Sequence, residues 1–82
     1  MPDLLITEKI VEILSNISEI EIFDERIELF DQGINSLQII ILVDELNKYF
    51  DLGIGLEILA KGASIEAIAE ALKKQAVTRI NL

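Results

Sequence analysis

Three segments of the chain place apolar residues at the spacing of an α-helix, and this pattern limits the fold class. A helix turns about 100° per residue, so apolar residues three and four positions apart share one face. The first segment carries such a face at Ile6, Ile10, Ile13, Leu14 and Ile17. The second carries one at Ile39, Leu42, Val43, Leu46 and Phe50. The third carries one at Ile65, Ile68, Ala69, Leu72 and Ala76. We therefore predict an all-α fold with three main helices.

The first helix and the loop after it are separated by polar residues. Asp3 is placed to cap the start of the helix, and the polar cluster within residues 15–19 marks its end. Residues 19–28 mix apolar and charged side chains with neither a helical nor a strand period, so we expect a loop held by its apolar side chains. An edge strand over residues 20–23 is an alternative without support from the pattern. The loop is long enough for the first two helices to run in either relative direction.

Glycines and one serine divide the second half of the chain. The second helix is predicted from Leu37 to about Tyr49 or Phe50, ending before Asp51, with Gly53 and Gly55 releasing the chain after it. Residues 56–60 suit one short helical turn that Gly62 ends. Ser64 then caps the last helix. The expected architecture is a small bundle of three main helices plus one short helix.

Size and composition restrict what this chain can do. Its 82 residues suit one domain, expected over residues 1–82, and leave too little interior for an enclosed substrate chamber. Sixteen Ile and twelve Leu make up a third of the chain, which distinguishes it from a disordered acidic tail. There is no Cys and no His, so disulfides, thiol nucleophiles, zinc sites of the usual composition and the commonest general base are excluded.

The charge is strongly negative and unevenly distributed. The net charge of −8 opposes binding to nucleic acids and to anionic membranes, and it favours partners with basic patches. Residues 1–35 carry nine acids and two bases, whereas residues 36–82 carry six acids and five bases. Electrostatic steering is therefore expected through the first helix and loop, although a solvated face that only keeps the domain soluble explains most of these acids equally well.

Neither a membrane span nor a basic leader is visible in the sequence. No run of about eighteen apolar residues occurs. Residues 1–9 include Asp3 and Glu8, whereas a secretory leader begins with a basic segment. We expect a cytoplasmic monomer that binds neither nucleic acid nor membrane.

The segment over residues 29–37 delivers a serine to the start of the second helix. Asp31, Gly33 and Asn35 have turn chemistry, and Ser36 follows them directly. A serine at this place is most simply a helix cap worth about 1 kcal/mol. The same place also favours a phosphodiester, because unpaired amides and the positive end of the helix dipole attract an anion. No base lies nearby in the sequence, so Ser36 suits modification by another enzyme better than catalysis.

These residues resemble the signature of the phosphopantetheine-dependent acyl and peptidyl carrier proteins, an Asp-x-Gly-x-Asp-Ser-Leu turn and helix start. The corresponding stretch here reads Asp31-Gln32-Gly33-Ile34-Asn35-Ser36-Leu37. The similarity extends over nearly the whole chain, from an amphipathic first helix and a long loop to the cap at Ser64, and a motif in its expected loop-to-helix context is more specific than the motif alone.

The resemblance implies an acyl-carrier-protein-like fold and a carrier that is not itself an enzyme. Ser36 would receive a covalent 4′-phosphopantetheine arm from coenzyme A through a separate phosphopantetheinyl transferase, which supplies magnesium and a base. Asp31, Gly33, Asn35 and Leu37 would support the attachment site. The arm would hold acyl or aminoacyl groups as thioesters and present them to acyl-loading and acyl-processing enzymes.

One residue departs from the family pattern, because Asn35 stands where the family usually has Asp. An Asn retains the capping geometry but removes a negative charge that could engage a cationic transferase surface. The affinity for a transferase, or the preference among transferases, is therefore expected to differ.

The face of the second helix that points away from its core stripe is predicted to bind partners. Leu37, Ile41, Asp44 and Lys48 lie on that face, with Ile40 at its rim. The residues predicted to bind partners are Leu37, Ile40, Ile41 and Asp44. A wider core contact is the alternative, but Asp44 and Lys48 could not be buried cheaply beside apolar side chains.

The few acids on this helix favour a polyketide or nonribosomal peptide pathway over fatty-acid synthesis, since the carriers of fatty-acid synthesis typically place several acids there. The competing class of function is a helical adaptor that is never modified and binds partners through the same apolar face.

Overall fold

The computed structural model describes residues 3–80, and the side chains of residues 4–75. This part of the chain holds three α-helices and two short 3₁₀ helices, so the all-α prediction is confirmed. The elements in chain order are α1 (Asp3–Ile17), η1 (Leu29–Gln32), α2 (Ser36–Phe50), η2 (Leu56–Leu59) and α3 (Ile65–Ile80). The short helical turn predicted over residues 56–60 is η2, whereas η1 was not predicted.

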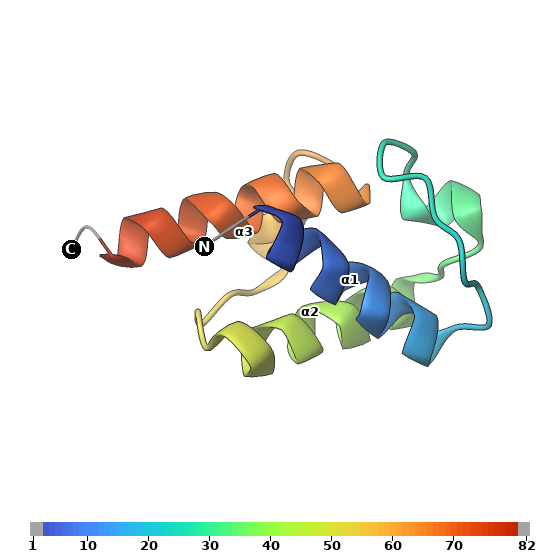
Figure 1. Ribbon diagram of the computed structural model, residues 1–82, viewed down its shortest axis with the longest axis horizontal. Helices are drawn as coiled ribbons and strands as arrows, with labels where there is room; N and C mark the ends of the chain where they lie inside the picture. The colour runs from blue at the N-terminus through green and yellow to red at the C-terminus, as the bar shows by residue number, and fades with distance from the viewer. Residues whose placement is uncertain (1–2, 81–82) are drawn as a thin grey trace.

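Helix α1 packs against both other helices and so forms the centre of the bundle. Figure 1 shows that α2 and α3 both run opposite to α1, and that the chain between α1 and α2 lies at one end of the molecule. The longest dimension of 38 Å runs along α3, on which η2 packs. The antiparallel course places the start of α2 beside the end of α1.

The predicted helical stripes form one hydrophobic core. Among the described side chains, seventeen hydrophobic ones are buried, and ten large ones are fully buried. The fully buried ones are Ile6, Ile10, Leu14, Leu29, Leu42, Leu46, Ile58, Ile65, Ile68 and Leu72. Ile17, Phe50 and Ala69 are only partly buried but pack against this core. The side chains of Asp3, predicted as a cap, and of Ala76, predicted in the third stripe, lie outside the described ones.

Local hydrogen bonds determine where the helices end. The Ser18 hydroxyl donates to the Leu14 carbonyl oxygen at 2.7 Å and closes α1. Asp51 ends α2 by taking the left-handed conformation itself, with φ of 53°, and its N–H donates to the Asn47 carbonyl. Gly53 also has positive φ but Gly55 does not, so the release of α2 begins two residues before the predicted glycines. The predicted cap of α3 is confirmed, since the Ala67 N–H donates to Ser64 Oγ at 3.1 Å.

The loop between α1 and α2 contains no strand and is tied to the start of α3. The Leu29 N–H donates to the Ala63 carbonyl at 3.0 Å, and the Glu66 N–H donates to the Glu25 carbonyl at 2.9 Å. The Glu28 carboxylate accepts the Ala63 N–H at 3.0 and 3.2 Å from its two oxygens. These bonds hold the loop against the bundle, as the course of the chain in Figure 1 shows.

Only some of the loop's apolar side chains hold it in place. Ile20 and Phe23 pack against the core, and Leu29 is completely buried in it. Ile22 is 89% exposed and Ile27 is 45% exposed, so these two do not anchor the loop.

An aromatic contact joins α1 and α2 at the end of the bundle away from the loop. The Lys9 ammonium lies 4.0 Å from the centre of the Tyr49 ring, which itself meets Phe50 edge to face. A cation above the face of an aromatic ring is attracted by the ring's quadrupole. This contact links the first half of α1 to the last turn of α2.

The helices in residues 3–80 are each too short or too polar to cross a lipid bilayer.

Replacing Leu29 by Ala tests whether the start of η1 belongs to the core. Because Leu29 is fully buried, Leu29→Ala is expected to lower the free energy of unfolding by about 2–5 kcal/mol. Ile22→Ala removes a similar side chain from an exposed position and is expected to change it by less than about 0.5 kcal/mol. Urea denaturation followed by circular dichroism measures both values. Equal effects of the two variants would contradict the packing described.

Candidate functional site

The turn that precedes α2 depends on a glycine in a left-handed conformation. Gly33 ends η1 with φ of 97° and ψ of 8°, and its N–H donates to the Leu29 carbonyl. A Cβ atom on Gly33 would lie 3.1 Å from Ile20 Cδ1, so a larger residue would be both strained and crowded. The next residue, Ile34, is buried, and its N–H donates to the same Leu29 carbonyl at 3.1 Å. The turn predicted here is confirmed.

Asn35 is the residue that caps α2. Its side-chain oxygen accepts the Gln38 N–H at 2.8 Å, and the Gln38 side-chain oxygen accepts the Asn35 N–H at 2.9 Å. This reciprocal arrangement is a capping box, in which the side chain of each residue accepts a hydrogen bond from the otherwise unpaired backbone N–H of the other. The expectation that Asn retains the capping geometry is confirmed. The simple interpretation of Ser36 as the cap is wrong, because that role belongs to its neighbour.

Ser36 is the first residue of α2 and is exposed to solvent. Within residues 3–80 its hydroxyl has no hydrogen-bond partner. The N–H groups of Ser36 and Leu37 also lack partners in this range, as expected for the first turn of a helix whose cap serves the third amide. The site therefore offers an accessible hydroxyl beside two open amides. These are the groups that a phosphate ester at this position would need.

Gln32 fixes the loop beside the turn through its side-chain amide, a role that the sequence did not reveal. Its Oε1 accepts the Asp24 N–H at 2.8 Å, and its Nε2 donates to the carbonyls of Asp24 and Ile27, both at 2.8 Å. The partners lie five and eight residues away in a segment without periodicity, so no local pattern could indicate them. The neighbouring Asp31 is exposed, and within the described residues its carboxylate makes no hydrogen bond or ion pair.

Gln38 connects the capped start of α2 to the end of α1. While its side-chain oxygen accepts from Asn35, its Nε2 donates to the Ile17 carbonyl at 3.3 Å. Ile17 is the last residue of α1, where carbonyl groups lack helical partners. One side chain thus serves two helix ends. A Gln three residues after a capping Asn is the sequence signal for the first of these bonds, and nothing in the sequence indicates the second.

The outward face of α2 exposes two apolar side chains. Leu37 is 65% exposed and Ile40 is 52% exposed, whereas Ile41 is partly buried. The helical arc alone predicted the opposite order of exposure for Ile40 and Ile41.

The acids on this face are partly neutralised by one base. Lys48 Nζ lies 3.0 Å from Asp44 Oδ2 and 3.9 Å from Glu45 Oε1. The hydrogen bond to Asp44 is the main cause that raises the pKa of Lys48 above its ordinary value of 10.5. The face therefore has little unpaired charge.

Other features of the described part of the chain do not add chemistry to this site. No group of three acidic side chains in residues 3–80 is arranged to hold a metal ion. A groove of about 660 Å³ lies between η2 and α3, and none of the predicted site residues lines it. The candidate site is therefore the start of α2 and its surroundings.

Replacing Asn35 tests the assignment of the cap. Asn35→Ala removes the bond to the Gln38 N–H and is expected to lower the free energy of unfolding by about 1 kcal/mol. Asn35→Asp keeps an acceptor at the same place and is expected to retain the stability. Ser36→Ala serves as the control, with an expected change below about 0.5 kcal/mol. A larger loss for Ser36→Ala than for Asn35→Ala, measured by thermal denaturation, would reassign the cap to Ser36.

Comparison with known proteins gives one match. A family model described as "Phosphopantetheine attachment site" matches residues 6–72, a range that begins in α1, ends in α3 and includes the whole turn before α2. No curated protein and no solved structure matches the chain.

Proposed function

The chain belongs to the phosphopantetheine attachment site family, and we propose that it carries acyl or aminoacyl intermediates on an arm attached to Ser36. A domain of this family is a carrier without catalytic activity of its own, and its cofactor is covalent 4′-phosphopantetheine. The observation that supports Ser36 as the attachment residue is its exposed hydroxyl, which is not used for capping because Asn35 and Gln38 cap the helix. We propose residues 1–82 as a single carrier domain.

The residues at the start of α2 suit a phosphodiester. Ser36 Oγ would form the ester bond, and the N–H groups of Ser36 and Leu37 would stabilise the phosphate charge together with the positive end of the helix dipole. Gly33 and the capping box keep the turn in the shape that exposes the hydroxyl. When attached, the arm supplies a terminal thiol that holds an acyl or aminoacyl group as a thioester.

Ser36 depends on another enzyme for the attachment. In that step the hydroxyl oxygen bonds to the phosphorus next to the pantetheine of coenzyme A, and the bond from that phosphorus to the adenosine bisphosphate breaks. The hydroxyl proton needs a base, and the described residues near Ser36 place no ionisable side chain in hydrogen-bond contact with it. Proteins of this family are modified by phosphopantetheinyl transferases, which supply the base and the metal ion.

The outward face of α2 is proposed to bind the enzymes that load and process the acyl group. Leu37 and Ile40 offer exposed apolar contact beside Ser36, with Ile41 and Asp44 along the same face. Because Lys48 pairs with Asp44, apolar contacts would take a large share of recognition. This balance supports a polyketide or nonribosomal peptide pathway. We further propose that the protein acts in the cytoplasm as a monomer.

The mass of the cargo on protein isolated from its host would test the pathway. A polyketide intermediate or an aminoacyl group supports the proposal, and a series of saturated fatty acyl groups contradicts it.

Loading by a transferase tests the attachment residue. Incubation with coenzyme A and a broad-specificity phosphopantetheinyl transferase is expected to add one arm to the wild type and none to Ser36→Ala, because only Ser36 has its hydroxyl at the start of α2. Intact-mass spectrometry measures both products. Ser64→Ala, which changes the capping hydroxyl of α3, is the control and should still accept one arm. An unmodified wild type would favour an adaptor that binds proteins through α2 alone.

Replacing Ile40 tests the proposed partner surface. For the protein with its arm attached, Ile40→Glu is expected to lower kcat/KM of acyl loading about tenfold, since it places a charge in an apolar contact. Leu4→Glu changes a side chain that is 68% exposed on α1 and is expected to leave the value within about twofold. The assay uses a loading enzyme that accepts the wild type. Equal values for the two variants would remove Ile40 from the partner surface.

A further inference from the structure

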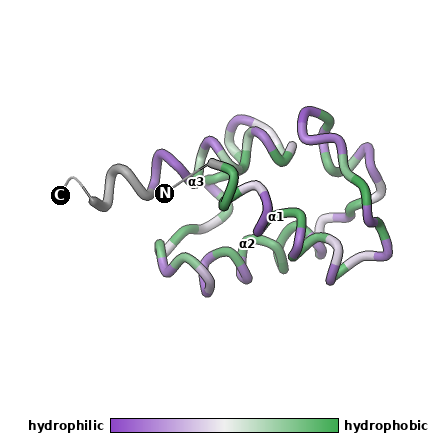
Figure 2. The backbone as a smooth tube through the Cα atoms, viewed as in Figure 1, coloured by the Kyte–Doolittle hydropathy of each residue, from purple (hydrophilic) through white to green (hydrophobic). Residues whose placement is uncertain are grey.

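The loop between α1 and α2 exposes apolar side chains that the bundle does not use. Ile22 is 89% exposed, Phe30 in η1 is 49% exposed, and Ile27 is 45% exposed. Figure 2 shows hydrophobic and hydrophilic residues following one another along this part of the chain. These three side chains belong to one segment of the chain and are available for contact with another protein. We call this surface the loop face and define it by Glu21, Ile22, Glu25, Ile27 and Phe30.

The loop face is held in shape before any partner binds. The Gln32 side chain bonds to both ends of residues 24–27, and Glu28 and Leu29 bond to Ala63. Two of these contacts join segments more than thirty residues apart, so they fix the loop to the body of the bundle. A surface that is already ordered loses little conformational entropy on binding.

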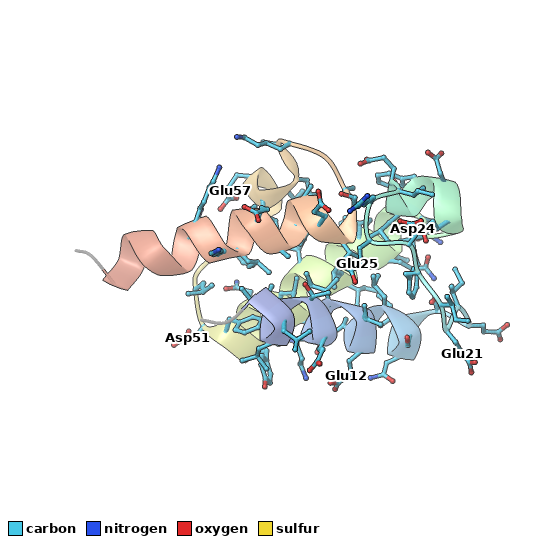
Figure 3. The ribbon with its side chains drawn as sticks, turned by 45° about the horizontal axis from the view of Figure 1, so that its top comes forward. Glu12, Glu21, Asp24, Glu25, Asp51 and Glu57 are labelled. Carbon is cyan, nitrogen blue, oxygen red and sulfur yellow. The ribbon has the colours of Figure 1, made fainter. Side chains whose placement is uncertain are left out.

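The loop face adjoins the proposed attachment site. Ile20 Cδ1 lies 3.1 Å from the place of a Cβ on Gly33, and Gln38 in the first turn of α2 bonds to Ile17, where the loop begins. Glu21 and Ile22 directly follow Ile20. Figure 3 shows Glu21 at the outer end of the loop and Glu25 farther in, beside the start of α3, where its carbonyl accepts the Glu66 N–H. An enzyme that reaches Ser36 would therefore have this loop within its contact area.

The loop face carries two acids that are not paired with a base. Glu21 and Glu25 are exposed, and their carboxylates make no ion pair within residues 3–80. The one base of the loop, Arg26, lies 3.8 Å from Glu66 of α3. On α2, by contrast, Lys48 is paired with Asp44 at 3.0 Å. Within the described residues, the exposed carboxylates without an ion pair in the chain before Ser36 include those of Glu21 and Glu25 on the loop and of Asp31 in η1, whereas Asp44 on α2 is paired.

The chemistry of coenzyme A identifies a partner for this charge. Coenzyme A carries a diphosphate and a separate phosphate, so an enzyme that binds it presents Lys and Arg side chains at the entrance of its site. That entrance must come to Ser36 for the arm to be transferred. We propose that the loop face is the docking surface for the phosphopantetheinyl transferase, with Glu21 and Glu25 facing its basic residues and Ile22 making the apolar contact. The proposal rests on the attachment of the arm at Ser36.

Loading kinetics of charge variants test this proposal. The double variant Glu21→Gln/Glu25→Gln is expected to lower kcat/KM for loading by about tenfold at low ionic strength, mainly through a higher KM, and to approach the wild type at high salt. Glu8→Gln/Glu70→Gln removes the same charge from exposed positions on α1 and α3 and is expected to stay within about twofold of the wild type. The assay uses the full chain, coenzyme A and one transferase, with arm transfer followed by intact mass.

The apolar contact is tested in the same assay. Ile22→Ser is expected to lower kcat/KM about fivefold at both low and high salt, because an apolar contact is not screened. The melting temperature of every variant is measured, and no change is expected since the replaced side chains are exposed and make no hydrogen bond.

Three results would overturn the proposal while leaving the attachment at Ser36 intact. One is a loop double variant that loads as fast as its control, and another is an Ile22→Ser variant that loads as fast as the wild type. The third is a larger drop in kcat/KM for arm transfer in Ile40→Glu than in the loop variants, which would place the transferase on α2. Failure of the wild type to accept an arm at all would instead refute the attachment itself.

Discussion

The pair of hydrogen bonds between Asn35 and Gln38 is the interaction on which the rest of the site depends. Each residue satisfies the other's backbone N–H, so the first turn of α2 begins at a fixed residue. Because the cap is Asn35, the hydroxyl of Ser36 is left for an external partner. The neutral amide of Asn35 achieves this geometry without the negative charge that the family usually has at this place.

The surroundings of the cap are supported from two directions. On one side the left-handed Gly33 and the buried Ile34 fix the approach of the chain. On the other side the loop after α1 is bound to the start of α3 through Glu28 and Leu29. The hydroxyl at the start of α2 thus lies on a well-supported part of a small protein. Such support holds a functional group in a defined position.

The helical stripes and the turn before α2 could be predicted from sequence because they follow from local spacing. The buried positions of α1 and α2 repeat every three or four residues, and Gly33 and Asn35 carry their conformational preference with them. Contacts between distant segments could not be predicted in this way. The η1 helix depends on the burial of Leu29, and the shape of the loop depends on the hydrogen bonds of Gln32. The partners of these two residues do not recur at a regular spacing in the sequence. The arc calculation placed Ile41 on the outward face of α2 and Ile40 at its rim, but Ile40 is the more exposed of the two.

Helices α1 and α2 are joined by the Gln38 amide, which bonds to the Ile17 carbonyl, and by the Lys9 ammonium, which lies over the Tyr49 ring. These contacts involve the first and the last turn of α2, so both oppose sliding of one helix along the other. An enzyme that binds this protein therefore meets a fixed frame, and the reach needed to visit successive active sites has to come from the swinging of the arm.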